Sequence, residues 1–304
     1  MGIIVLGSIN VDLQATLPRF AASGETLIAH TLAVSSGGKG ANQALAARRM
    51  GAAVSLIGRI GNDSYGKMAL SKIQKAGVNL EGVQTMDEMS TGLAWIEIDA
   101  KGHNRITVAP GANQYVGDEE LTRLSNTLRS EDQLLLQLEV PPWVVGEAIR
   151  IGKERGARVY LDPAPIPAEW LDALWKADVI LPNQHEASAL VKKTIATLED
   201  ACEGARFIQQ HIAGAVVLKL GEQGLVCATP QAIYTIPPYL VDTVDDTGAG
   251  DVLVGALAAF VDEGRSFEHA LRYAAQAAAL ATTRKGTQEA IPFREEIEVA
   301  NSTL

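Results

Sequence analysis

The stretch QLLLQLEVPPWVVGEAIRIGKERGARVYL, residues 133–161, decides the fold class. It opens with a short apolar run over 133–138, which predicts a buried strand. A helical pattern follows over 143–155, and a second apolar run over 158–161 predicts another strand. Short apolar strands joined by helices are typical of a parallel sheet that is covered on both faces.

The same alternation continues along most of the 304 residues. Further strands are predicted at 3–6, 54–57, 179–181 and 216–220, and further helices at 40–50, 64–76, 118–128 and 198–211. Gly51 and Gly77 stand where a left-handed cap would end two of these helices. The carboxyl-terminal third is predicted to be almost entirely helical. We therefore expect a three-layer α/β/α core with a mainly parallel central sheet.

Two segments, residues 12–36 and 91–109, interrupt this alternation with strand-like pieces. The second has the pattern of a β-hairpin, with GLAWIEI and NRITVA on either side of a turn at 99–102. We expect the two segments to form a small β-sheet lid, inserted into a core made of residues 1–11, 37–90 and 110–304. An ordinary edge hairpin is the alternative.

Composition and charge exclude several classes of function. The chain has 26 basic and 36 acidic residues, with no run of Lys and Arg longer than two, so nucleic acid is not an expected partner. Two cysteines without CxxC spacing and five scattered histidines predict neither a disulfide nor a zinc site. The amino terminus does not resemble a signal peptide, and no apolar stretch approaches the ~20 residues that cross a bilayer. We expect a cytoplasmic protein.

The sharpest functional pattern is DDTGAGD, residues 245–251, directly before the apolar helical run 252–260. Glycines at a helix entrance let backbone N–H groups point at a ligand, and the helix dipole favours an anion there. Asp251, at the end of this turn, is placed to take a proton from an alcohol that attacks phosphorus. An ordinary Asp-capped turn is the alternative. A monomeric aspartic protease would need a second Asp-Thr-Gly, and the chain has none.

A second glycine-rich pattern, SGGKGAN at 36–42, precedes the helix predicted at 40–50. It is not a P-loop, because GxxxxGK[ST] would need Gly in place of Ala33 and Ser or Thr in place of Gly40. The glycine pair lets a ligand approach the backbone, and Lys39 and Asn42 supply polar contacts. A simple turn before a helix is the alternative.

Polar side chains also follow the carboxyl ends of three predicted strands, where open α/β sheets bind their ligands. Asn10 and Asp12 follow the first strand and alternate with apolar residues, so both should face the same side. Glu139 follows the strand at 133–138, and Asn183 follows the strand at 179–181, with Glu186 one helical turn further on. Each alone is more often a helix cap or a solvated loop residue. Their shared position makes the set a candidate site.

Several segments then occur in order along the chain: GSINVD (7–12), GGKGANQA (37–44), STGLA (90–94), PGAN (110–113), QLE (137–139), PNQHEA (182–187), DTGAGD (246–251) and TRKGTQEAIPFREEI (283–297). In this combination the sequence resembles the PfkB-type carbohydrate kinases, and within them the ribokinase branch. The resemblance covers the whole chain. It implies the ribokinase-like α/β core with a β-sheet lid, and ATP-dependent phosphorylation of the 5-hydroxyl of D-ribose to D-ribose 5-phosphate.

The resemblance also implies roles for individual residues. Asp251 would be the catalytic base, with the backbone N–H groups of Gly248, Ala249 and Gly250 as an anion hole. The sugar would be bound by Asn10, Asp12, Gly38, Lys39, Asn42, Glu139 and Asp251; ATP and Mg²⁺ by Asn183, Glu186, Lys219, Gly221, Gly224 and Gly250; and a monovalent cation such as K⁺ by Asp245 and the carbonyls of Thr247, Ala281, Arg284 and Gly286. Clasped lid sheets would make the protein a homodimer.

This sequence departs from the ribokinase pattern at a few positions. Asp246 replaces a small Thr or Pro, Lys219 replaces a Thr near the phosphates, and Ala275 replaces a polar residue beside the adenine. Ala290 replaces a Ser that offers its hydroxyl to the cation, which puts the K⁺ dependence in question. The alternatives are a kinase of the same fold for deoxyribose, fructose or adenosine, and a non-catalytic sugar-binding regulator. An oxidoreductase is a weaker alternative, because the chain has no GxGxxG.

Overall fold

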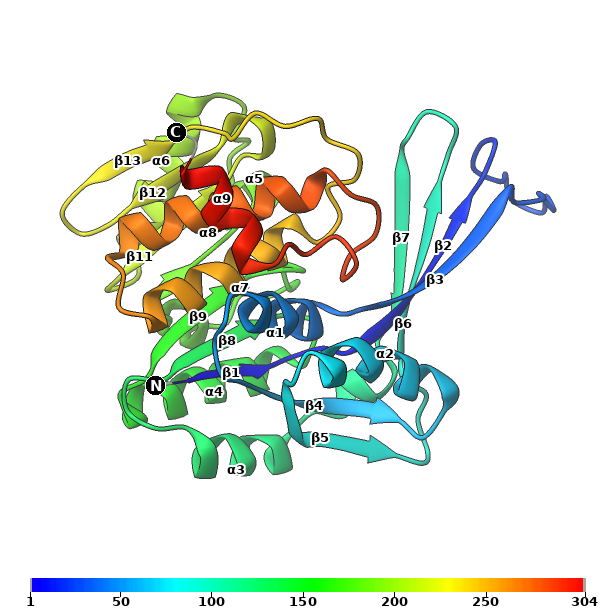
Figure 1. The fold of residues 1–304 in the computed structure, drawn as a ribbon, viewed down its shortest axis with the longest axis horizontal. Coiled ribbons are helices and arrows are strands. Elements are labelled where there is room, and N and C mark those ends of the chain that lie inside the picture. The colour runs from blue at the N-terminus through cyan, green and yellow to red at the C-terminus, as the bar shows by residue number, and fades with distance from the viewer. Residues whose placement is uncertain (1, 303–304) are drawn as a thin grey trace.

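The computed structural model describes residues 2–302 and is built around a nine-stranded sheet (Figure 1). Its strand order is β13-β12-β11-β10-β9-β8-β1-β4-β5, and all neighbours are parallel except the β11–β12 and β12–β13 pairs. The strands are β1 (Ile3–Leu6), β4 (Val54–Gly61), β5 (Asn79–Met86), β8 (Gln133–Gln137), β9 (Arg158–Asp162), β10 (Val179–Ile180), β11 (Ala215–Lys219), β12 (Leu225–Ala228) and β13 (Ile233–Ile236). The expected mainly parallel sheet is confirmed.

Two apolar cores cover the two faces of this sheet, because alternate residues of each strand point to opposite sides. Ile3 and Val5 of β1 belong to one core, and Ile4 and Leu6 to the other. The first core packs under α1 (Lys39–Arg49), α2 (Ser64–Lys75), α7 (Ala249–Asp262), α8 (Phe267–Thr282) and α9 (Arg294–Ser302). The second packs under α3 (Asp118–Thr127), α4 (Pro142–Arg155), α5 (Gln184–Val191) and α6 (Leu198–Gln209). The three-layer α/β/α architecture is confirmed.

A second, four-stranded sheet projects from the core (Figure 1), with strand order β3-β2-β6-β7. Its strands are β2 (Asn10–Thr16), β3 (Thr31–Gly37), β6 (Gly92–Ile98) and β7 (Asn104–Ala109). The β6–β7 pair is the hairpin expected from GLAWIEI and NRITVA. Strand β2 begins at Asn10, two residues before the expected boundary, so both Asn10 and Asp12 lie at the root of this sheet.

Some predicted elements were wrong in extent. Helix α7 begins at Ala249 rather than 252, which puts Asp251 in its first turn. Strand β4 continues past residue 57 to Gly61, although it contains two glycines and an arginine. Strand β5 was not predicted, because it lies at the sheet edge and alternates between exposed and half-buried residues rather than forming an apolar run. The β12–β13 hairpin was also missed.

Candidate active site

The parallel strand order reverses at β1, which pairs with β4 on one side and β8 on the other. The carboxyl ends of β1 and β8 therefore flank a topological switch point, the usual ligand site of such sheets. Glu139, just beyond β8, accepts hydrogen bonds from Asn10 Nδ2 at 3.3 Å and from the backbone N–H of Lys39 at 3.3 Å. It also accepts one from Ser8 Oγ at 2.5 Å. The three predicted segments at 7–12, 37–44 and 137–139 thus meet at one carboxylate.

Asn113, a residue that the sequence reasoning did not single out, fixes the orientation of Asn10. Its side-chain nitrogen donates to Asn10 Oδ1 at 2.7 Å, while its side-chain oxygen accepts the backbone N–H of Ile9 at 2.9 Å. With its oxygen held in this way, Asn10 turns its nitrogen toward Glu139. The PGAN segment contains Asn113, so the sequence did carry a signal for this residue. Its partners Ile9 and Asn10 are close in space but far away along the chain.

Gly38 caps the amino end of α1 and has a positive φ of 88°. A Cβ built there would lie 2.6 Å from the backbone nitrogen of Asn10, so only glycine fits. This close approach places Lys39 beside the strand ends. Its Nζ lies 3.9 Å from Asp251 Oδ1 and 3.5 Å from Asp162 Oδ2. Burial acts to lower the pKa of Lys39, but the carboxylates of Asp251, Asp162, Glu139 and Glu186 together outweigh it and raise the pKa.

Asp251 is 5% exposed and lies in the first turn of α7. Gly248, the residue that caps this helix, has a left-handed φ of 80°. Asp251 accepts hydrogen bonds from Asn42 Nδ2 at 2.9 Å and from Gln43 Nε2 at 3.1 Å. Burial raises the pKa of its carboxyl, and Lys39 opposes this shift. The backbone N–H groups of the first helical turn have no acceptor within the helix, so a carboxylate and an anion-binding turn lie side by side.

Asp12 is a second buried carboxyl, 8% exposed, at the root of the projecting sheet. Burial raises its pKa to about 7, and the negative charges of Glu139 and Asp251 act in the same direction. Thr287 Oγ1 is its hydrogen-bond donor, at 3.5 Å. Among residues 2–302, this long contact is the hydrogen bond that a side chain donates to the carboxyl.

Asp162 and Gln43 were missed by the sequence reasoning, although they lie in the centre of the site. Asp162 ends β9, has no exposed surface and accepts hydrogen bonds from Lys219 Nζ at 2.7 Å and Gln43 Nε2 at 3.3 Å. Burial acts to raise its pKa, but Lys219 and then Lys39 lower it. Two adjacent buried carboxyls are thus driven apart in pKa, Asp162 downward and Asp251 upward. Such a separation distinguishes a permanent anion from a proton acceptor.

Asn183 and Glu186 form a capping box at the start of α5. The backbone N–H of Asn183 donates to Glu186 Oε2 at 2.7 Å, and the N–H of Glu186 donates to Asn183 Oδ1 at 2.8 Å. Burial raises the pKa of Glu186, although Lys219 opposes the shift. Lys219 and Gly221 border the same hollow as Asn183, a cavity of about 500 Å³. Gly224 closes the turn after Gly221 and has a φ of 83°.

The residues expected to bind a monovalent cation lie in two adjacent loops. Asp245, before α7, accepts backbone N–H groups from Thr247 and from Gly286, each at 3.0 Å. Its own N–H donates to the carbonyl of Thr282, at the end of α8. The carbonyl of Ala281 accepts the N–H of Arg284 at 3.3 Å. Asp245 therefore joins the two loops that carry the expected carbonyl ligands.

Comparison with known proteins places the chain in a family. The model of the pfkB family of carbohydrate kinases matches residues 2–294. The chain belongs to the pfkB family of carbohydrate kinases. Ribokinase of Haemophilus influenzae is 35% identical over 292 residues, 96% of this chain and 95% of that protein. Deoxyribokinase of Salmonella typhi is 32% identical, covering 97% of each chain. The structure of Arabidopsis thaliana ribokinase complexed with ribose and ATP superposes with a TM-score of 0.88, at 29% identity, covering 98% of this chain and 97% of that one.

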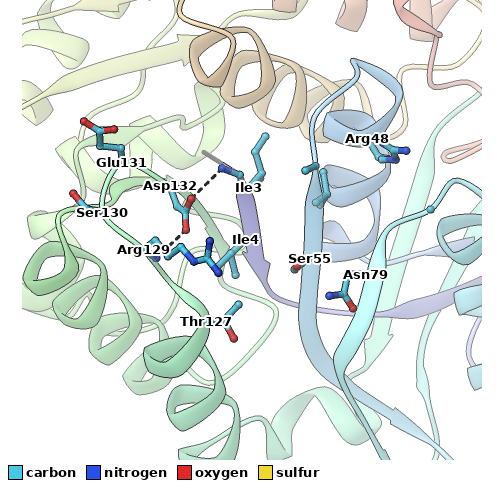
Figure 2. A pocket seen from close by; sticks show the side chains of 14 residues that line it. Ile3, Ile4, Arg48, Ser55, Asn79, Thr127, Arg129, Ser130, Glu131 and Asp132 are labelled. Atoms are coloured by element: carbon cyan, nitrogen blue, oxygen red, sulfur yellow. Dashed lines mark hydrogen bonds between the residues drawn. The ribbon is translucent and has the colours of Figure 1, made fainter.

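This pfkB kinase has another hollow at the opposite end of its central sheet, about 630 Å³ in volume (Figure 2). It lies at the amino ends of β1, β4 and β5, and Asp132 and Arg48 line it. Asp132 accepts backbone N–H groups from Gly2 and Arg129, at 3.0 and 2.8 Å. Arg48 donates to the carbonyls of Ala76 and Ala52, at 2.9 and 3.0 Å. The chain's own backbone thus satisfies these two charged groups.

None of the helices within residues 2–302 is long and apolar enough to cross a bilayer. No cluster of three or more His, Cys, Asp or Glu side chains in this part of the chain is arranged to hold a metal ion by itself.

Proposed function

We propose that this pfkB kinase transfers the γ-phosphoryl group of ATP to the 5-hydroxyl of D-ribose. The observation that carries the proposal is Asp251, a buried carboxylate with a raised pKa directly beside the anion-binding amino end of α7. Asp251 takes the hydroxyl proton as the sugar oxygen forms its bond to phosphorus. The bond from phosphorus to the bridging oxygen breaks, and ADP leaves with that electron pair. The N–H groups of Gly248, Ala249 and Gly250 stabilise the negative charge of the phosphoryl group.

The sugar is proposed to bind between the strand ends and the projecting sheet. Asn10, Asp12 and Glu139 present oxygens and an amide from one side, and Lys39 and Asn42 complete the set from α1. Such groups match the alternating donors and acceptors of a polyhydroxyl compound. Burial and the negative charges of Glu139 and Asp251 raise the pKa of Asp12 to about 7. Sugar hydroxyls would supply this carboxyl with donors in addition to Thr287.

ATP is proposed to bind along β11 and the start of α5. Lys219 Nζ is 3.4 Å from the position of a Cβ built on Gly250, so its cation faces the same turn as the transferred phosphoryl group. Glu186 supplies a buried carboxylate in the first turn of α5. Mg²⁺ is usually bound through one or two carboxylates together with substrate phosphates, which suits Glu186 and Asn183. When bound, Mg²⁺ would neutralise charge on the phosphates.

A K⁺ site is proposed at the paired loops joined by Asp245. One carboxylate and backbone carbonyls are oxygen ligands of the kind that K⁺ accepts. Ala290, buried and without a hydroxyl, removes one ligand from this set. We therefore expect a weaker dependence on K⁺ than a complete set would give.

The four-stranded sheet is proposed to be a lid that also forms a homodimer contact. Strand pairing puts Leu32, Val34 and Trp95 on the face opposite to Asp12, and they are 60%, 44% and 42% exposed. Exposed apolar residues grouped on one face are typical of protein interfaces. Trp95→Glu should shift the protein from dimer to monomer in light scattering after size exclusion. Leu198→Glu is the matched control and should not, because Leu198 is a similarly exposed apolar residue on α6, outside the four-stranded sheet. A wild-type monomer would contradict the dimer.

Release of ADP, measured with Mg-ATP and a panel of alcohols, tests the proposed function. The panel is ribose, 2-deoxyribose, fructose and adenosine, each with and without K⁺. Deoxyribose is included because a deoxyribokinase is as similar to this chain as several ribokinases are. Turnover at least tenfold faster with ribose than with the other alcohols is expected. Faster turnover of another alcohol would overturn the substrate and keep the reaction, and no turnover with any of them would contradict the kinase activity.

A further inference from the structure

The centre of the site contains a buried bridge between the sugar half and the nucleotide half. Asp162 Oδ1 contacts Lys219 Nζ on the nucleotide side, at 2.7 Å. Its Oδ2 faces Lys39 Nζ at 3.5 Å and Gln43 Nε2 at 3.3 Å on the sugar side. Gln43 Nε2 also donates to Asp251 Oδ1 at 3.1 Å. One carboxylate is therefore in contact with both lysines and is linked to the proposed base through a single amide.

The orientation of Gln43 is fixed by a third side chain. Gln137 Nε2 donates to Gln43 Oε1 at 2.6 Å, so the Gln43 oxygen points away from the two carboxylates. A flipped amide would turn an oxygen toward two anions and place two NH₂ groups face to face. Gly7 leaves room for this arrangement, since a Cβ there would lie 1.9 Å from Gln137 Oε1. In this arrangement Gln43 donates to both carboxylates and accepts from Gln137, whereas Gln137 Oε1 is buried with no hydrogen-bond partner among residues 2–302.

We propose that Asp162 is a positioning residue for phosphoryl transfer: it holds Lys39 and Lys219 in place and, through Gln43, sets the orientation of Asp251. This inference rests on the proposed function. Burial supports this inference, because Asp162 and Gln43 have no exposed surface. Removing a carboxylate from water costs free energy that only close, hydrogen-bonded partners offset. The contact with Asp162 would keep Lys219 Nζ beside the turn at Gly250, where the phosphoryl group is proposed to be transferred.

The charged groups around Asp251 determine how its proton affinity responds to changes in the bridge. Lys39 faces it from α1, Asp162 from the end of β9 and Asp12 from β2. Glu139, Glu186 and Lys219 act on the same charge cluster from further away. Asp162 raises the pKa of Asp251 through its charge, and the hydrogen bond from Gln43 lowers it. Removing Asp162 or Gln43 should therefore shift the pKa of Asp251 in opposite directions.

The experiment compares Asp162→Asn with Gln43→Met in the full-length protein. In D162N, kcat should fall at least tenfold, by a larger factor than KM for the sugar rises through the loss of the Asp162–Lys39 contact, and the acid limb of the pH–kcat profile should move to lower pH. In Q43M the acid limb should move to higher pH. The Asp178→Asn variant is the matched control, because Asp178 pairs with Lys153 and caps the opposite end of β9 at Val159. It should leave the profile unchanged.

A double-mutant cycle separates positioning from simple structural support. If Asp162 acts in part by holding Lys219, then the loss in D162N combined with Lys219→Met should be clearly smaller than the sum of the two single losses. Additive losses, or acid limbs that do not move in D162N and Q43M, would overturn the proposal even if kcat falls. Titration of the Asp251 carboxyl by ¹³C NMR, assigned with Asp251→Asn, measures the same opposite shifts without turnover. A wild-type protein that is inactive with ribose would count against the proposed substrate, whereas unmoved titrations would count against Asp162.

Discussion

The two ends of the central sheet both place charged side chains beside a hollow, and they use charge in opposite ways. At the amino ends of the strands, Asp132 and Arg48 are satisfied by backbone N–H and carbonyl groups. At the carboxyl ends, Asp12 and Asp251 lie close to other carboxyls and have raised pKa values. The hollow at the amino ends is no smaller than the cavity at the nucleotide side. Perturbed pKa values, rather than the size of a cavity, distinguish the end where we propose that ligands bind.

The largest effect should come from Asp251, the proposed base at the carboxyl ends of the strands. In Asp251→Asn the side chain keeps its shape and loses its ability to take a proton. We expect kcat to fall by about 10³-fold, within the range of a lost general base, while ribose and ATP still bind. Steady-state kinetics with calorimetric binding would measure both. Turnover within tenfold of the wild type would remove Asp251 from the role of base and weaken the contrast between the two ends.

The next effect concerns stability and the charge on Asp12. Its pKa is about 7 in the folded protein and 3.8 ordinarily. Between these values the folded chain keeps a proton that the unfolded chain has released, so the free energy of unfolding should decrease as pH rises from about 4 to about 7. This term amounts to about 4 kcal/mol, at about 1.4 kcal/mol per pH unit. Urea unfolding of wild type and Asp12→Asn at several pH values should show the difference. Parallel curves would contradict it.

A smaller effect is expected at Gly38, where the backbone conformation rather than charge builds the site. An alanine there would adopt a left-handed φ, at a cost of about 1–2 kcal/mol, and its Cβ would also collide with the backbone of Asn10. Both Lys39 and Asn10 should move, so KM for the sugar should rise severalfold. Gly264→Ala is the control, because its φ is 95° and nothing lies near its Cβ position. An equal rise in KM for the sugar in both variants would show that the backbone conformation alone matters, and not the contact with Asn10.

Sequence reasoning succeeded where the signal is local. The β6–β7 hairpin was predicted from two alternating runs, and the α/β core from short apolar strands separated by helices. Hydrogen bonds and the Lys39–Asp251 ion pair connect the predicted residues Asn10, Lys39, Asn42, Glu139 and Asp251. These residues carry their own pattern, a glycine-rich turn or the end of a strand.

Sequence reasoning failed where the meaning of a residue depends on distant partners. Asp162 stands before a proline at a strand end and has the pattern of an ordinary loop residue, yet Lys39 and Gln43 contact it from 123 and 119 positions away. Gln43 is a polar residue in a predicted helix, which is the pattern of a surface position. In the structure, α1 is buried over most of its length, and Gln43 with it. Only the packing of α1 against α7 and β9 brings these groups together, and no spacing along the chain encodes it.

The smallest effect should come from the amino ends of the strands, through Asp132→Asn. This carboxylate accepts two backbone N–H groups, so the asparagine retains one acceptor and leaves one donor unmatched. We expect a loss of about 1 kcal/mol in the free energy of unfolding. The pH–kcat profile should not move, because Asp132 lies at the end of the sheet opposite to Asp251. Chemical unfolding and kinetics on the same preparation would measure both. A shifted acid limb in Asp132→Asn would show that charge at the two ends is coupled through the sheet, and the division of roles proposed here would fail.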